Sequence, residues 1–297
     1  MKEPDSEGAR PSDTVAGVVR SVREDARGIV APDAGLQRFR LERFPPSAEV
    51  GRMVDRYWVG TWDLRGRPSH TQHVFAHPVV NVTFQDGGPG LVTGVTTAVG
   101  SRTLSGAGRV LGIMFRPAGF RPLLGRPLST IRDVTLPWSS VVADAVADDM
   151  ARAVAAAPDG EGMAAAADAA LARLAAALVP PDPQPWEGTA ALVERIAADP
   201  AFLTVEDVAR DAGATARQVQ RRFADHVGIS PKAVIRRYRL YEAAERARGG
   251  GRVDWAEVAA SLGYSDQAHL TRDFTASFGL PPGRYLAANT APGAAAT

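Results

Sequence analysis

An internal repeat in the last third of the chain constrains its fold more than any other feature. Residues 204–209 resemble residues 254–259 at an offset of 50, and Gly213 matches Gly263 at the same offset. Beyond this glycine the offset becomes 51. The residues that match there are Val219 with Leu270, Arg221 with Arg272, Phe223 with Phe274, Gly228 with Gly279 and Pro231 with Pro282. The repeat predicts two copies of one supersecondary structure, with one residue inserted in the second.

Each copy has the sequence of a helix-turn-helix unit. Thr204 and Asp254 can cap the first helix, and an acidic residue follows each of them after three positions. Gly213 and Gly263 suit the left-handed residue that ends this helix. A second helix then begins after a cap at Thr215 in the first copy and at Ser265 or Asp266 in the second.

The second helix of each copy is predicted to read DNA. Apolar residues spaced by four positions mark its buried side, so the opposite side faces outward, as in a helix that enters the major groove. Arginine, glutamine, threonine and alanine side chains can all contact base edges or thymine methyl groups. The predicted base contacts are Arg217, Gln220, Arg221, Gln267, Ala268, Thr271 and Arg272. A solvated helix face is the alternative, and Ala268 predicts that the second helix reads fewer bases because it offers no hydrogen bond.

Basic residues cluster around the first copy. Residues 214–252 hold ten Lys or Arg and three acidic residues, although the net charge of the whole chain is only +1. A cap at Ser230 followed by Pro231 predicts a long joining helix to about Arg248. Contacts to phosphates would add affinity without sequence preference. The predicted DNA-backbone contacts are Thr204, Thr215, Lys232, Arg236, Arg237 and Tyr285, and for the three in the joining helix a solvated face is the alternative.

These residues carry a resemblance to a known family. Residues 204–286 resemble the DNA-binding domain of the AraC/XylS regulators, above all in the segments Gly-Ile-Ser-Pro-Lys (228–232), Leu-Gly-Tyr-Ser-Asp-Gln-Ala-His-Leu (262–270) and Phe-Gly-Leu-Pro-Pro-Gly-Arg-Tyr (278–285). The resemblance implies sequence-specific binding to double-stranded DNA and control of promoters, usually by activation. It also implies RNA polymerase as a partner. The absence of cysteine fits a cytoplasmic location.

Residues 37–136 have a different amino-acid pattern. Short runs rich in valine, threonine and aromatic residues alternate with glycine and proline, which predicts an antiparallel β sandwich or barrel-like domain. Segments 56–58, 77–84, 104–106 and 115–120 resemble a β-rich sensor-like domain of undefined ligand that precedes such DNA-binding domains. A small-molecule effector pocket or a plain core would both suit its aromatic and polar residues. The candidate pocket residues are Trp58, His77, Asn81, Phe84 and Arg116.

The remaining segments complete an α+β fold of two domains, the second of which (188–288) is all-α. Alanine-rich residues 137–179 predict two helices with a break near residues 158–160. These helices would form either the contact surface of a homodimer or a bridge between the two domains. Four prolines in 180–187 predict a stiff linker. Residues 1–36 and 289–297 read as disordered tails.

Several kinds of chemistry are excluded or disfavoured. The chain has no cysteine, which excludes disulfides, thiolate metal sites and cysteine nucleophiles. It shows no nucleophile elbow or phosphate-binding loop, so we expect neither an enzyme nor a cofactor.

His70 does not share a strand face with His73 and His77, so no metal site is predicted. No apolar run of about 18 residues predicts a membrane span. Three hypotheses remain: an effector-responsive regulator, a regulator whose first domain only dimerises or binds a protein, and an enzyme with an appended DNA-binding module.

Overall fold

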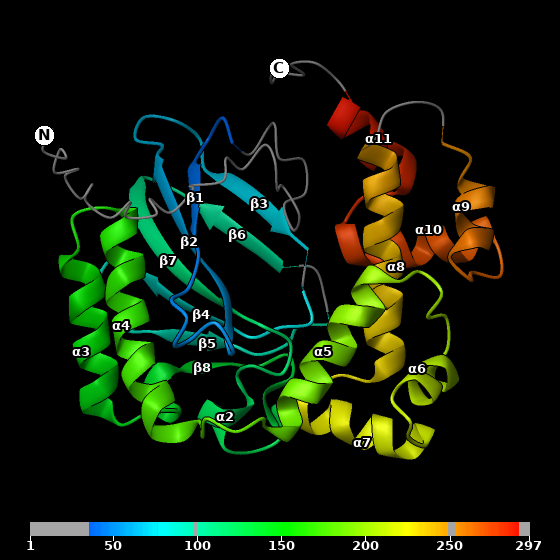
Figure 1. The fold of residues 1–297 in the computed structure, drawn as a ribbon. Coiled ribbons are helices and arrows are strands. Elements are labelled where there is room, and N and C mark those ends of the chain that lie inside the picture. The colour runs from blue at the N-terminus through cyan, green and yellow to red at the C-terminus, as the bar shows by residue number, and fades with distance from the viewer. Residues whose placement is uncertain (1–35, 76, 98–99, 249–252, 291–297) are drawn as a thin grey trace, which may run out of the picture.

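The computed structural model describes residues 36–75, 77–97, 100–248 and 253–290. An antiparallel sheet backed by helices forms the N-terminal domain, and helices alone form the C-terminal domain (Figure 1). The predicted α+β class with two domains is confirmed. The predicted tails at 1–36 and 289–297 lie almost wholly outside the described residues.

The strands form two separate sheets. Their bounds are β1 (Arg40–Phe44), β2 (Val54–Asp63), β3 (His70–Val74), β4 (Asn81–Gln85), β5 (Leu91–Thr93), β6 (Gly100–Leu104), β7 (Ala107–Phe115) and β8 (Thr135–Pro137). Six strands pair in the order β1-β2-β7-β4-β5-β8, while β3 and β6 pair with each other, and all these pairs are antiparallel. The larger sheet ends in β1 on one side and β8 on the other. It is therefore open, and the expected barrel-like shape is corrected to an open sheet with a separate hairpin.

The register of β2 against β7 gives the larger sheet two different faces. Tyr57 lies opposite Ile113, and Trp58 lies opposite Gly112. Because successive side chains alternate across a strand, Tyr57 and Trp58 point to opposite faces. The face of Tyr57 is covered by two helices, since the Tyr57 hydroxyl donates to the Asp168 carboxylate at 2.9 Å and Arg109 donates to the backbone oxygen of Ala155 at 2.6 Å.

The covering helices are α3 (Asp144–Ala156) and α4 (Gly160–Leu178), which lie together beside the sheet (Figure 1). The predicted break between them is confirmed, and Asp159 caps α4 by accepting from the Gly162 N–H at 2.8 Å. Most buried positions of α4 are alanines, which let the helix approach its neighbours closely. Short elements connect this layer to the sheet, namely α2 (Arg121–Leu124), η1 (Leu128–Ile131) and η2 (Trp138–Ser140).

The C-terminal domain contains seven of the described helices. They are α5 (Pro185–Ala198), α6 (Val205–Asp211), α7 (Ala216–His226), α8 (Pro231–Arg248), α9 (Trp255–Ser261), α10 (Gln267–Phe278) and α11 (Pro282–Thr290). The start of α5 lies inside the segment predicted as linker. Pro185 takes the first helical position there, where its missing N–H costs nothing.

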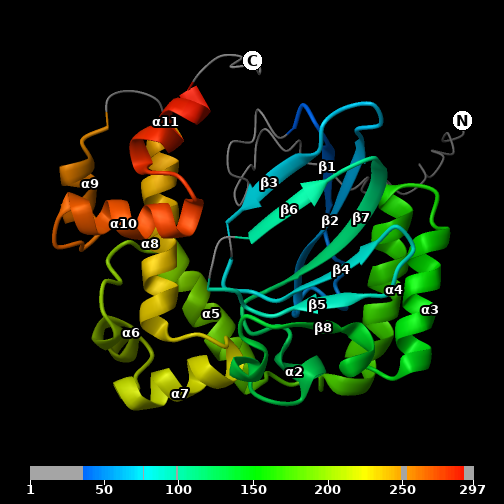
Figure 2. The same cartoon turned by 180° about the vertical axis from the view of Figure 1, so that it is seen from behind.

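The hydrophobic core extends across the boundary between the two domains. One cluster of buried residues runs from the sheet through η1 to α5, α6, α7 and the first half of α8, and it includes Val59, Leu128, Val193 and Phe223. A second cluster holds the rest of the C-terminal domain. From behind, α5 lies between the sheet and α8, and α2 lies beside α7 (Figure 2). The first helix-turn-helix unit is therefore packed into the N-terminal domain.

Within the described residues, no helix combines the length and apolar character needed to cross a membrane. The same part of the chain contains no group of three or more His, Cys, Asp or Glu side chains arranged to hold a metal ion.

Candidate nucleic-acid interface

The first unit consists of α6 and α7, joined through Gly213 at a φ of 56°. The Thr204 hydroxyl accepts from the Asp207 N–H at 3.1 Å, while the Asp207 carboxylate accepts from the Thr204 N–H at 2.9 Å. Hydrogen bonds from the Thr204 side chain and backbone stabilise the ionised carboxylate and lower the pKa of Asp207 to about 2. The predicted capping box is thus present, and a second one at Thr215 and Gln218 begins α7.

The second unit repeats this arrangement with α9 and α10, and Gly263 between them has a φ of 74°. Asp254 caps α9 by accepting from the Ala256 and Glu257 N–H groups. The Asp266 carboxylate accepts from the His269 N–H at 2.7 Å, so Asp266 rather than Ser265 caps α10. Both glycines occupy the left-handed region that the turn requires.

The two second helices, α7 and α10, present their predicted faces outward. On α7 the buried side is formed by Val219 and Phe223, which are 0% exposed. On α10 it is formed by Leu270 and Phe274, which are also 0% exposed. Of the predicted base contacts only Thr271 is half-buried; the exposed ones are Arg217, Gln220, Arg221, Gln267, Ala268 and Arg272. These exposed faces, one in each unit, form the candidate interface.

The predicted DNA-backbone contacts on α8 differ from one another. Lys232 is exposed, as a phosphate contact requires. Arg236 forms an ion pair with Asp273 on α10, although half of its side chain stays exposed. Arg237 instead donates to the backbone oxygen of Thr96 in the N-terminal domain at 2.7 Å, and burial lowers the pKa of its guanidinium. The expectation for Arg237 is therefore corrected: it is an interdomain contact.

The other predicted backbone contacts lie in the caps and in the core. Thr204 and Thr215 are exposed, but their hydroxyls serve as helix caps. Tyr285 is 1% exposed and its ring lies 5.3 Å from that of Phe274. The side chain of Tyr285 is a core residue of the second unit, which overturns the predicted phosphate contact.

The five candidate effector-pocket residues do not come together. Phe84 is 2% exposed and points to the face covered by α3 and α4, so it is a core residue. Arg116 donates to Glu194 on α5 at 3.1 Å, and His77 meets Tyr241 on α8. The expectation for Phe84 is therefore corrected, while Arg116 and His77 form contacts between the domains.

Trp58 and Asn81 share the face opposite the helices and remain half-buried. Trp58 lies over Gly112, where a Cβ atom would come within 1.9 Å of the indole ring. The glycine therefore makes room for the ring on this face. Met114, Thr83 and Val110 are half-buried on the same face.

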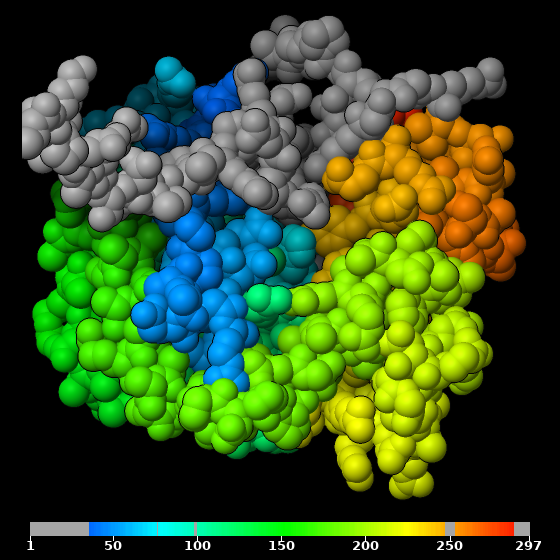
Figure 3. All heavy atoms as spheres, in the orientation of Figure 1, coloured from blue at the N-terminus to red at the C-terminus, as the bar shows by residue number. Residues whose placement is uncertain are grey.

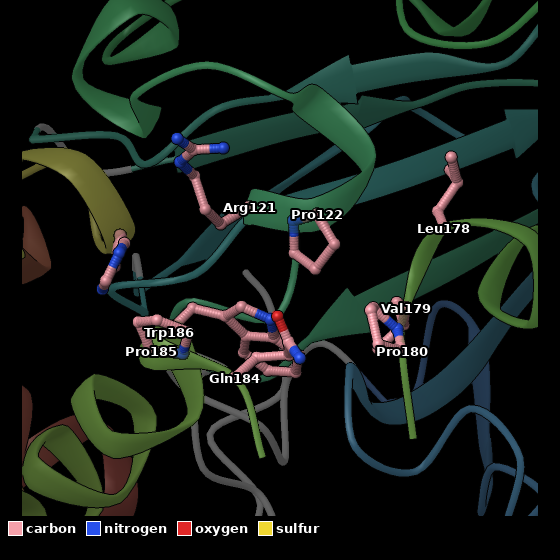
Figure 4. A pocket seen from close by; sticks show the side chains of 9 residues that line it. Arg121, Pro122, Leu178, Val179, Pro180, Gln184, Pro185 and Trp186 are labelled. Atoms are coloured by element: carbon pink, nitrogen blue, oxygen red, sulfur yellow. The ribbon is translucent and has the colours of Figure 1, made fainter. Parts of the chain in front are cut away.

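A cleft of about 260 Å³ lies between the domains, where side chains of α2 face residues 184–186 (Figure 4). None of the five candidate pocket residues lines it. Two of its polar side chains already have partners, because Arg121 donates to Asp225 at 2.7 Å and His226 Nδ1 lies 2.8 Å from the Thr189 hydroxyl. The cleft is better described as a gap in the domain interface than as a ligand site.

Ion pairs between the domains were not predicted. Arg52, in the β1–β2 connection, donates to Glu187 on α5 at 2.7 Å, and this hydrogen bond lowers the pKa of Glu187. In Figure 3 the blue atoms of this connection lie directly against the light-green atoms of the α5 region. These residues are more than a hundred positions apart, and no local pattern in the sequence marks them as partners.

We expect His226 to make this interface sensitive to pH. Burial lowers its pKa below the usual 6.5, so the unfolded chain takes up a proton before the folded chain does. The free energy of unfolding should therefore fall as the pH drops below 6.5, by up to about 1.4 kcal/mol per pH unit. We expect His226→Gln to flatten this dependence in urea unfolding between pH 7.5 and 5.5. The exposed control His73→Gln should keep it, and equal slopes for wild type and His226→Gln would contradict the assignment.

Comparisons with known proteins address each domain. A family model described as a helix-turn-helix domain matches residues 208–288, and one described as a domain of unknown function (DUF6597) matches residues 42–137. A Streptomyces lividans protein, named provisionally as an AraC-like transcription regulator, is 34% identical over 89 residues. That match covers 30% of this chain and 29% of the relative, so the chain spans less than a third of its length.

Solved structures with some likeness were also found. An AraC-type regulator from Chromobacterium violaceum is 22% identical with a TM-score of 0.31, over 34% of this chain and 91% of that one. ToxT from Vibrio cholerae is 10% identical with a TM-score of 0.42, over 86% of this chain and 100% of that one.

Two capped helix-turn-helix units joined by one helix, each with an exposed polar face on its second helix, define a DNA-binding protein with a double helix-turn-helix domain. The helix-turn-helix family model covers this domain from the middle of α6 to α11. This C-terminal domain is similar to the corresponding part of an AraC-like transcription regulator. The resemblance drawn from the repeat is confirmed.

Proposed function

We propose that this regulator binds one face of duplex DNA with both units, so that α7 and α10 each read a sub-site in the major groove. The observation that carries the proposal is the exposure of Arg217, Gln220 and Arg221 on α7 and of Gln267 and Arg272 on α10. Arginine can pair with guanine and glutamine with adenine. The Arg236–Asp273 ion pair supports joint reading, because it ties α8 to α10.

Selection of DNA from a random pool by the full-length protein tests this proposal. We expect a motif with two sub-sites about one helical turn apart. The sub-site read by α10 should hold fewer fixed positions, because Ala268 offers no hydrogen bond. A motif with a single sub-site would refute joint reading, and no enrichment at all would refute sequence-specific binding by the protein as isolated.

Lys232 is proposed to contact a phosphate. Its replacement by alanine should weaken binding to selected and random DNA alike, and should reduce the slope of log affinity against log salt by about 0.9. A titration of both DNAs between 50 and 200 mM salt measures this slope. Arg173→Ala removes one positive charge from the exposed side of α4 and should leave the slope unchanged. An equal slope for Lys232→Ala and wild type would remove Lys232 from the interface.

We propose that the N-terminal domain responds to a small-molecule effector and that the protein activates transcription through RNA polymerase. The sheet face opposite the helices supports an effector site, because Trp58, Asn81 and Met114 are half-buried there and neither α3 nor α4 covers that face. In vitro transcription from a promoter that carries the selected site tests the sign of regulation. Increased transcript supports activation, whereas decreased transcript would indicate repression.

A further inference from the structure

One aromatic side chain of the N-terminal domain lies inside the core of the second helix-turn-helix unit. Phe75 directly follows β3 and is only 3% exposed. Its ring lies 4.0 Å from that of Tyr241 on α8 and is stacked on Phe278 of α10 at 4.6 Å, measured between ring centroids. All other fully buried members of this cluster come from residues 240–285. The second unit thus completes its core with a residue from outside the DNA-binding domain.

Two neighbouring contacts fix the same end of the β3–β6 hairpin to α8. His77 Nε2 lies 2.5 Å from the Tyr241 hydroxyl, and Arg237 donates to the backbone oxygen of Thr96, which precedes β6. Val74 pairs with Gly100, so the segment after β3 and the segment before β6 leave the hairpin at one end. Both views show this hairpin beside α8 and α11 (Figures 1 and 2).

The contact does not block the reading helix. With Phe75 in place, Gln267, Ala268 and Arg272 on α10 stay exposed, whereas Phe278 near the end of the same helix is 2% exposed. Phe75 therefore touches the buried side of α10 and leaves its outward side open. Removing an aromatic ring from a small core loses both apolar burial and packing, so the elements around it should loosen first.

We propose that the N-terminal domain governs the second reading helix through Phe75: the β3–β6 hairpin supplies part of the core that holds α10 in place. This inference rests on the proposed function, since it concerns how α10 is presented to DNA. A conformational change in the N-terminal domain would then alter the position of α10, and so its contact with the second sub-site, through the β3–β6 hairpin. The first unit is held by a different surface, formed by η1, α2 and α5.

Hydrogen exchange of the full-length protein without DNA tests the contact itself. In Phe75→Ala, amide exchange in α9 to α11 should rise roughly tenfold or more, while α6 and α7 keep their wild-type protection. Val74→Ala is the matched control, because Val74 is the preceding residue and is 37% exposed. Unchanged protection in α9 to α11 would overturn the proposal, as would an equal loss of protection throughout the protein. Phe75→Leu, which retains an apolar side chain, should lie between wild type and Phe75→Ala.

Binding to the selected DNA tests the consequence. We expect Phe75→Ala to lose roughly 10- to 100-fold in affinity, the contribution of one or two specific base contacts, and to lose its preference at the sub-site read by α10 only. Unchanged or tighter binding by Phe75→Ala would overturn the proposed role. If wild type and Val74→Ala both fail to select any sequence, the proposed function fails, while the exchange experiment still decides whether Phe75 supports the second unit.

Discussion

Replacing Arg221 and Arg272 together by alanine should abolish most sequence preference in DNA binding. The two residues occupy matching positions in the repeat, one on α7 and one on α10, and both are exposed. A bidentate arginine–guanine pair contributes about 1–3 kcal/mol of discrimination. Because the two side chains belong to separate units, their effects should add, which gives about 2–6 kcal/mol for the double variant. Fluorescence anisotropy on selected and random duplexes measures the loss.

Each single variant serves as the internal control for this prediction. Arg221→Ala should relax preference at one position of the first sub-site, and Arg272→Ala at one position of the second. Affinity for random DNA should change far less, because most nonspecific affinity comes from phosphate contacts. An equal loss on selected and random DNA would show that the arginines contact phosphates rather than bases.

Replacing Arg239 by alanine should cause the largest loss of stability among the variants proposed for this protein. Arg239 on α8 is 3% exposed, and its Nη2 donates to the backbone oxygens of Asp199 and Phe202, each at 2.8 Å. These hydrogen bonds fasten the α5–α6 connection to α8. The alanine variant would leave two carbonyl groups without a donor and a cavity beside them. We expect the free energy of unfolding to fall by about 2–5 kcal/mol.

Urea unfolding of the full-length protein, followed by circular dichroism, measures this loss. Arg210→Ala is the matched control, because the Arg210 side chain is 76% exposed and forms an ion pair with Asp207 on its own helix. Such an exposed pair contributes about 0–1 kcal/mol. Arg239→Met keeps much of the side-chain volume but cannot donate, so it should remain strongly destabilised. Near-wild-type stability of Arg239→Met would show that volume, not hydrogen bonding, is what Arg239 provides.

The sequence was most informative where structure is local. The caps at Thr204, Thr215 and Asp254 and the left-handed turns at Gly213 and Gly263 depend on residues within a few positions of each other. Because the two units are repeats, equivalent caps and turn glycines occur in both of them. The outward direction of α7 and α10 followed from the spacing of apolar residues along one helix, which fixes the buried side before any tertiary contact is known.

Expectations failed where a residue's surroundings come from distant parts of the chain. Arg237 and Arg236 are neighbours on α8 with the same chemistry, yet one binds Thr96 in the N-terminal domain and the other Asp273 on α10. Tyr285 was predicted to contact the DNA backbone, but it packs inside the second unit. A strand's alternation could not say which face the helices cover, so Phe84 was grouped with Trp58 although they point to opposite sides.

The two helix-turn-helix units, the residues at which each unit begins and turns, and the exposed faces of α7 and α10 could all be predicted from the amino-acid sequence. Those properties depend on hydrogen bonds and periodicity within about twenty residues. Two features became visible only in the folded protein: one core joins the first unit to the N-terminal domain, and Phe75 enters the core of the second unit. Both depend on how the sheet and helices pack together. Removing apolar surface from water stabilises a contact regardless of how far apart its residues are in the sequence.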